Sequence, residues 1–140
     1  MNIVPADLWS AMVTILAVLF VFYTGFHVGQ MRGKHNIKAP ATAGHPAFEC
    51  AYRVQMNTLE QFVLFLPLLW LATIYFRTWA WLPPLLGLVW IVGRILYMQG
   101  YMQAPEKRGP GFAIGGVALL ALLILAIVGI VQDWSALNAA

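Results

Sequence analysis

Four long apolar stretches dominate this chain and limit how it can fold. Residues 8–31 contain no charged side chain, and residues 110–132 are equally free of charge. Residues 48–76 and 79–102 are also apolar, apart from a few charged or amide side chains. Because a helix needs roughly 20 mostly apolar residues to cross a bilayer, each stretch is long enough to span. The pattern predicts an all-α integral membrane protein, a bundle of four transmembrane helices.

The composition also favours a chain that folds in lipid. Of the 140 residues, 61% are hydrophobic and only 9% are charged, whereas soluble domains carry about 25% charged residues. Four helices and short connections use nearly the whole sequence, so we expect a single domain over residues 1–140. The net charge of +3 is not arranged as a basic stripe with interleaved aromatic residues, and a nucleic-acid partner is therefore not expected.

Basic and aromatic residues predict how the chain is oriented in the membrane. The polar segment 32–47 and the connection 103–109 fall on one side, and both termini and Arg77 fall on the other. The first side carries Arg32, Lys34, Lys38, Lys107 and Arg108, while Trp9, Trp79, Trp81 and Trp134 fall near the opposite interface. By the positive-inside rule the basic loops face the cytoplasm. Because the loops are short, we expect a bacterial inner membrane, with both termini on its far side.

The second apolar stretch carries a polar stripe. Arg53, Asn57 and Glu60 are spaced i, i+4 and i+7, which places them on one face of a helix. With a rise of about 1.5 Å per residue, the stripe descends roughly 10 Å from the cytoplasmic end. A charge at bilayer depth costs at least about 2.5 kcal/mol and must find protein or water partners. These three residues are therefore candidate site residues.

The third stretch repeats the pattern with Arg94, Tyr97 and Tyr101. One interpretation is structural, with Arg94 as a charge pair for Glu60 and the tyrosines marking the interface. The other is a binding site, because the arginines outnumber the acid that they surround. Arg32, Arg53, Arg94 and Arg108 supply this surplus of positive charge. Guanidinium groups match carboxylates in a two-pronged geometry, so the surplus suits an anionic ligand with carboxylates.

Cysteine and histidine residues indicate weaker candidates. The single cysteine, Cys50, allows no intrachain disulfide, and a thiol–base pair with His45 lacks an orienting third group. His27, His35 and His45 do not have the spacing of metal ligands. We therefore expect no metal site.

Two motifs resemble a known family. The run from Phe48 to Glu60, FECAYRVQMNTLE, and the run from Gly93 to Tyr101, GRILYMQGY, followed by Pro105 and Arg108, resemble those of MAPEG proteins, the membrane-associated proteins in eicosanoid and glutathione metabolism. The resemblance covers essentially the full chain. It implies a homotrimer that binds glutathione between neighbouring subunits near the cytoplasmic face.

The resemblance also implies roles for individual residues. Arg32, Arg53, Asn57, Glu60, Tyr97 and Tyr101 would bind glutathione, and Gln55 would contribute from the adjoining subunit. Glu60 would hold the amino group of glutathione and the arginines its carboxylates. Arg108 would be catalytic, because a guanidinium beside the glutathione sulfur favours the reactive thiolate. A lipophilic electrophile would enter from the lipid between subunits, along the first and fourth helices.

Two departures from the leukotriene-forming members narrow the expected activity. Gly33 stands where those enzymes have a second arginine, and Gln61 where they have a tyrosine. A general glutathione S-transferase for detoxification, with peroxidase activity toward lipid hydroperoxides, fits better. The alternative is a non-catalytic lipid-binding scaffold of the same family. A small multidrug exporter is a third reading, but it would require an acid within the first helix, which has none.

Overall fold

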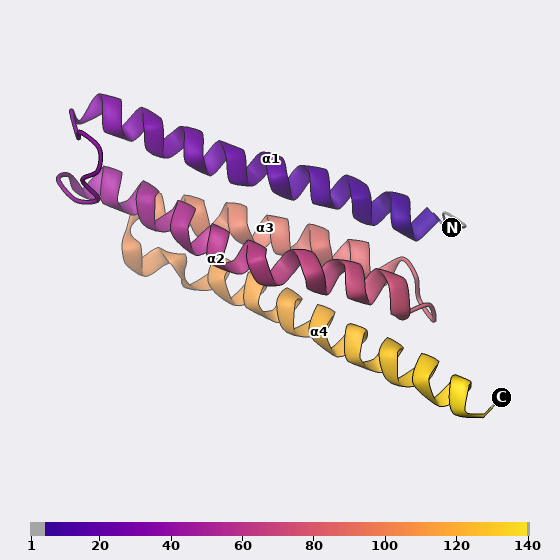
Figure 1. Cartoon of the computed structure of the whole chain (residues 1–140). Coiled ribbons are helices and arrows are strands. Elements are labelled where there is room, and N and C mark those ends of the chain that lie inside the picture. The colour runs from indigo at the N-terminus through magenta and orange to yellow at the C-terminus, as the bar shows by residue number, and fades with distance from the viewer. Residues whose placement is uncertain (1–4, 140) are drawn as a thin grey trace.

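The computed structural model describes residues 5–139, and the elements in that range are helices. Four long helices, α1 (Pro5–Lys34), α2 (Pro46–Tyr75), α3 (Leu82–Gln103) and α4 (Gly109–Asn138), are joined by loops and by the 3-10 helix η1 (Pro105–Arg108). They lie side by side in one elongated bundle (Figure 1). All four are long and apolar enough to cross a membrane. The prediction of an all-α bundle of four apolar helices is confirmed.

The ends of the helices differ from the predicted ones. α3 begins at Leu82 rather than at residue 79, because residues 78–81 form a turn. Pro83 and Pro84 then occupy the first turn of the helix, where a missing backbone N–H breaks no hydrogen bond. α4 continues to Asn138, beyond the predicted end at residue 132. Loss of hydrophobicity marks where a helix leaves the lipid, and it does not require the helix itself to stop there.

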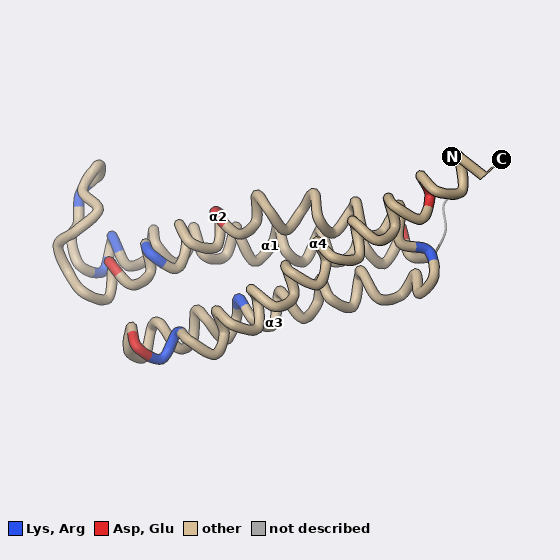
Figure 2. The backbone as a smooth tube through the Cα atoms, turned by 90° about the horizontal axis from the view of Figure 1, so that it is seen from below, with Lys and Arg blue, Asp and Glu red and all other residues tan. Residues whose placement is uncertain are grey.

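Basic side chains gather at one end of the bundle. This basic end consists of residues 32–46 and 103–109, and Figure 2 shows most of the lysines and arginines near it. Both termini lie at the opposite end (Figure 1). There Arg77, which follows α2, approaches Asp133 of α4 at 4.0 Å. The loops and termini are thus distributed between the two ends as predicted.

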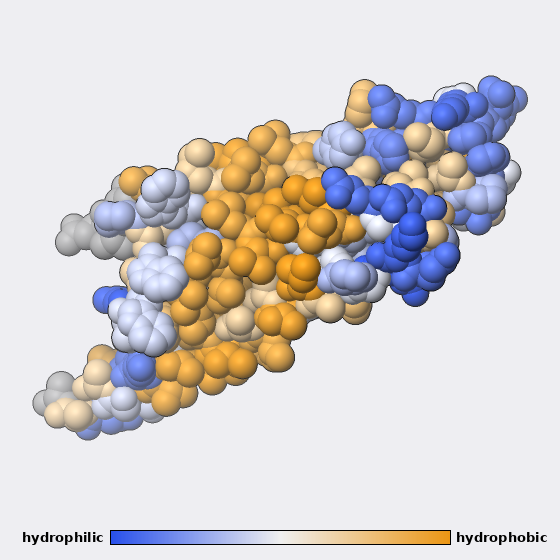
Figure 3. Space-filling model, turned by 180° about the vertical axis from the view of Figure 1, so that it is seen from behind, coloured by the Kyte–Doolittle hydropathy of each residue, from blue (hydrophilic) through white to orange (hydrophobic). Residues whose placement is uncertain are grey.

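The outer surface between the two ends is apolar. Figure 3 shows a continuous hydrophobic band there, with hydrophilic residues concentrated toward the ends. Large apolar side chains of the long helices are exposed, among them Phe22, which is 72% exposed, and Val117, which is 68% exposed. Such a surface would be unfavourable in water and is suited to lipid.

The core lies at the centre of the bundle and contains contributions from all four helices. Val13, Phe65, Trp90 and Leu122 are buried there. The Trp90 ring stacks on Phe65 with 4.0 Å between centroids. Its indole N–H donates to Oε1 of Gln61 at 3.1 Å, which satisfies a polar group that lipid could not.

Glycines let α4 pack closely against α3. A Cβ atom at Gly111 would overlap the backbone nitrogen of Tyr97, and one at Gly93 would lie 2.7 Å from the backbone nitrogen of Gly115. The spacing of Gly111 and Gly115 is therefore used for helix packing. The similar spacing of Gly25 and Gly29 is not used in the same way, because a Cβ at Gly29 would meet nothing within 4 Å. The close α3–α4 contact brings the start of α4 beside Tyr97.

Candidate functional site

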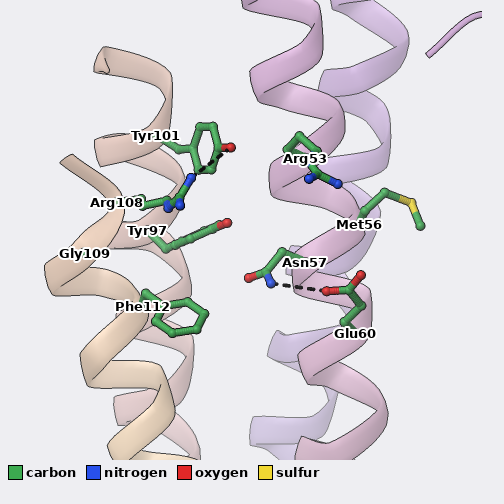
Figure 4. A pocket seen from close by; sticks show the side chains of 9 residues that line it. All are labelled: Arg53, Met56, Asn57, Glu60, Tyr97, Tyr101, Arg108, Gly109 and Phe112. Carbon is green, nitrogen blue, oxygen red and sulfur yellow. Dashed lines mark hydrogen bonds between the residues drawn. The ribbon is translucent and has the colours of Figure 1, made fainter. Parts of the chain in front are cut away.

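A cavity of about 420 Å³ opens near the basic end, between α2 on one side and α3 with the start of α4 on the other (Figure 4). We call it the main cavity. It is lined by Arg53, Met56, Asn57, Glu60, Tyr97, Tyr101, Arg108, Gly109 and Phe112. Six of these residues were selected from the sequence: Arg53, Asn57, Glu60, Tyr97, Tyr101 and Arg108. Residues that are far apart in the chain thus meet in one place.

One wall of the main cavity is the polar stripe of α2. Arg53, Asn57 and Glu60 all line the cavity from α2, and Figure 4 shows Asn57 pointing toward α3 and α4. The amide nitrogen Nδ2 of Asn57 donates to Oε2 of Glu60 at 3.3 Å. Arg53 and Glu60 are both exposed to the cavity and its surroundings in the single chain. This wall offers a cation, an amide and a carboxylate to a ligand.

The facing wall comes from α3, η1 and the start of α4. Nη1 of Arg108 donates to the hydroxyl of Tyr101 at 3.3 Å, and the Tyr101 and Tyr97 rings meet edge to face at 5.5 Å. η1 can fold back on α3 because residue 100 is glycine: a Cβ there would overlap the carbonyl oxygen of Lys107. This close approach places the Arg108 guanidinium across the cavity from α2 (Figure 4).

Arg94 lies behind the main cavity and is fully buried, with 0% of its surface exposed. Nη1 donates to Oδ1 of Asn57 at 3.1 Å, and Nη2 donates to the hydroxyl of Thr58 at 2.8 Å. Its guanidinium also lies 4.1 Å from the centroid of the Tyr97 ring. The direct charge pair with Glu60 that the structural interpretation supposed is not formed. The amide of Asn57 stands between the two charges and bonds to both.

Two predicted binding residues lie away from the main cavity. Nη1 of Arg32 donates to the carbonyl of Ala41 at 2.7 Å, and its guanidinium lies 4.7 Å from the centroid of the Phe48 ring. Gln55 faces α1, and its Nε2 would be 3.1 Å from a Cβ at Gly25. The face of α2 that carries Gln55 is opposite the polar stripe, because two residues along a helix turn through about 200°. Within one chain, neither residue reaches the cavity.

Sequence reasoning missed Met56, Gly109 and Phe112, which also line the main cavity. Met56 is three residues after Arg53, and Phe112 is four residues after Arg108, so both follow from helical spacing once a site is assigned to those faces. Their sequence context gives no signal of its own, since apolar residues in a membrane helix by default pack against other helices or contact lipid. Phe112 gives the cavity an apolar side, with 49% of its own surface exposed.

The His45–Cys50 pair considered from the sequence is not arranged for catalysis. Nδ1 of His45 accepts from the backbone N–H of Ala47 at 3.2 Å, so the ring caps α2. The same ring stacks on His35 with 3.6 Å between centroids. Partial burial and the charges of His45 and Lys34 lower the pKa of His35. Cys50 instead lines a second cavity of about 310 Å³, which shares Arg53 and Tyr101 with the main cavity.

These features define a class of protein: four apolar helices of membrane-spanning length with a charged, tyrosine-lined cavity near one end. Sequence comparison makes the assignment specific. The MAPEG family model matches residues 10–128, and the chain belongs to the MAPEG family. The resemblance inferred from its two motifs is confirmed.

Several relatives match over most of their own length. An uncharacterized protein of Synechocystis sp. is 45% identical over 123 residues, which are 88% of this chain and 88% of that protein. Leukotriene C4 synthase of Cavia porcellus is 39% identical over 89% of this chain and 81% of its own. Microsomal glutathione S-transferase 2 of Homo sapiens is 41% identical over 81% of this chain and 77% of its own.

Proposed function

We propose that this protein is a membrane-bound glutathione transferase, which binds glutathione as a co-substrate and conjugates it to lipophilic electrophiles. The observation that carries the proposal is the main cavity, where Arg53, Glu60 and Arg108 are brought together with two tyrosine hydroxyls. Relatives of similar length are named microsomal glutathione S-transferase 2 and leukotriene C4 synthase. The first of these names supports a glutathione-using enzyme.

The chemistry of the main cavity suits a tripeptide with two carboxylates, one ammonium group and a thiol. Glu60 binds the ammonium group, and Arg53 binds a carboxylate through its guanidinium fork. Asn57, Tyr97 and Tyr101 supply the neutral hydrogen bonds that hold the peptide. Because the cavity mixes both signs of charge, it discriminates against ligands that carry only one.

Arg108 is the proposed catalytic residue. A free thiol has a pKa of about 8.5, so only a small fraction is thiolate at neutral pH. The Arg108 guanidinium favours the anion, and the thiol proton passes to solvent. The sulfur then attacks the electrophilic carbon of the acceptor, a carbon–sulfur bond forms, and the leaving group departs with its electron pair. With a lipid hydroperoxide, the thiolate would attack the terminal oxygen, the O–O bond would break, and the alkoxide would leave and take up a proton to give the alcohol. A second glutathione would then attack the resulting sulfenic acid, giving glutathione disulfide and water.

Arg32 and Gln55 reach glutathione only from a neighbouring copy of the chain. Both lie on the α1 side of the subunit, away from its own main cavity. A homotrimer, the assembly implied by the resemblance, would place the α1 side of one subunit against the cavity of the next. The acceptor would enter from the lipid along the groove between α1 and α4 of adjoining subunits, where Phe112 provides an apolar contact.

The basic end supports a cytoplasmic orientation of the site, since by the positive-inside rule the loops that carry most of the lysines and arginines face the cytoplasm. Glutathione is a cytoplasmic thiol, so this orientation supplies the co-substrate. Gly33 and Gln61 stand at the two positions where the sequence differs from the leukotriene-forming members. We therefore propose a general detoxifying activity in a bacterial inner membrane. The alternative, a lipid-binding scaffold, has no use for the charged residues of the cavity.

A conjugation assay tests the proposal. The purified protein in detergent, supplied with glutathione and a chromogenic aryl halide, is expected to form the thioether faster than the uncatalysed reaction, with saturation in both substrates. Binding of glutathione without any conjugation of aryl halides or reduction of lipid hydroperoxides would favour a non-catalytic role. Absence of both binding and turnover would support the scaffold.

A further inference from the structure

We propose that Arg94, which does not line the main cavity, is a positioning residue for glutathione binding: it orients the amide of Asn57 so that Asn57 holds the carboxylate of Glu60. The inference rests on the proposed function, because it concerns how the same site is prepared for its ligand. It assigns Arg94 a role through other residues and not through contact with the substrate.

The surroundings of Arg94 are unusual for a purely structural arginine. Its side chain is fully buried, yet within residues 5–139 the ion pair that forms is between Arg77 and Asp133, and no carboxylate there pairs with Arg94. Its Nε–H also lacks an acceptor in that range. A buried charge without a partner is costly, and an apolar residue would stabilise the fold equally well or better. The hydrogen bonds that Arg94 does make are both directed at α2, to Asn57 and Thr58.

The contact with Asn57 determines which way its amide points. A guanidinium has only donors, so the Asn57 atom that faces Arg94 at 3.1 Å must be the oxygen. The NH₂ group is then on the other side of the amide, where it donates to Oε2 of Glu60. Without Arg94 the amide could turn over and present its oxygen to the carboxylate, which would repel it. Only one orientation of the Asn57 amide therefore allows hydrogen bonds to both Arg94 and Glu60.

Thr58 holds the guanidinium in place for this task. Its hydroxyl donates to the carbonyl of Val54 at 2.7 Å and accepts from Nη2 of Arg94 at 2.8 Å. The Tyr97 ring packs against the guanidinium from α3. As a result one oxygen of Glu60 is engaged by Asn57, and Oε1 is left for the ammonium group of glutathione.

Calorimetric measurement of the Kd for glutathione tests the inference. Arg94→Lys keeps the buried positive charge but cannot donate to Asn57 and Thr58 at the same time through the two nitrogens of a planar guanidinium. We expect this substitution to raise Kd about tenfold. In an Asn57→Ala background no amide remains to be oriented, so the same substitution is expected to change Kd by less than about twofold. An equal loss in both backgrounds would indicate a general structural effect and would overturn the inference.

Thr58→Val provides a second test of the positioning role, one that leaves Arg94 itself unchanged. It removes the acceptor for Nη2 while keeping the side-chain shape, and we expect Kd to rise about fivefold. Thr58→Ser, which keeps the hydroxyl, is expected to rescue binding.

Thr73→Val is the matched control, because it makes the same change in the same helix at a buried hydroxyl pair with Ser10, 2.7 Å apart. We expect it to leave Kd unchanged. A Thr58→Val protein that binds like the wild type, or an equal loss in Thr73→Val, would refute the positioning role. If the wild-type protein itself fails to bind glutathione, the proposed function falls, and the positioning role falls with it.

Discussion

Arg108→Ala is expected to lower kcat for aryl halide conjugation about 30-fold at pH 7, because a thiol with a pKa near 8.5 is only about 3% thiolate at that pH. Arg108 lines the main cavity and is held against Tyr101, so its removal takes away the nearby positive charge without disturbing the core. The loss should shrink toward pH 9, where free glutathione ionises without help. Rates of conjugation across this pH range at saturating glutathione provide the measurement.

The control for this variant is Lys107→Ala. Lys107 is the preceding residue of η1, is also a cation, and directs its Nζ to Gln103 at 3.4 Å and not to the cavity. We expect its pH–rate profile to match the wild type. An Arg108→Ala enzyme with wild-type turnover at pH 7, or a loss that is the same at pH 7 and pH 9, would remove Arg108 from thiolate activation.

Glu60→Gln is expected to raise the Kd for glutathione about 30-fold, as befits loss of a hydrogen bond between charged groups. The carboxylate is the only acid among the residues that line the main cavity, so nothing nearby can replace it as the partner of the ammonium group. Because this interaction is the same in the ground state and the transition state, kcat at saturating glutathione should change much less. Calorimetry and steady-state kinetics together separate this variant from Arg108→Ala.

A ligand control makes the Glu60 prediction specific. Glutaryl-cysteinylglycine, which lacks the amino group of glutathione, is expected to bind the wild type and Glu60→Gln equally. Glu106→Gln, a change at an exposed acid of η1, should bind glutathione like the wild type. If Glu60→Gln weakened both ligands by the same factor, Glu60 would have a structural role and would not be the ammonium partner.

Much of the fold could be predicted because lipid imposes simple requirements on a helix. An uncharged stretch such as residues 8–31 has no stable alternative in a membrane, and the stripe of Arg53, Asn57 and Glu60 follows from the helical repeat alone. Helix ends were less predictable. α4 extends to Asn138 because nothing after residue 132 breaks a helix, although hydrophobicity has ended.

The candidate site was only partly predictable because periodicity gives the face of a helix but not its neighbour. A charge pair between Arg94 and Glu60 was one interpretation of the sequence, and the spacing could not show that Asn57 would lie between them. It gave no sign that Gln55 would face Gly25 of the same subunit. Phe112 was missed for a related reason. An aromatic residue in an apolar helix belongs to a binding site only if polar residues of other helices lie beside it, and the sequence does not show which helices are neighbours.

The most direct test of glutathione binding in the main cavity is calorimetric titration of the detergent-purified wild-type protein with glutathione. We expect saturable binding that is weakened about 30-fold in Glu60→Gln and unchanged in Glu106→Gln, since the cavity between α2 and α3 would recognise both signs of charge on the peptide. Heats of dilution alone, with well-folded protein at millimolar glutathione, would contradict it.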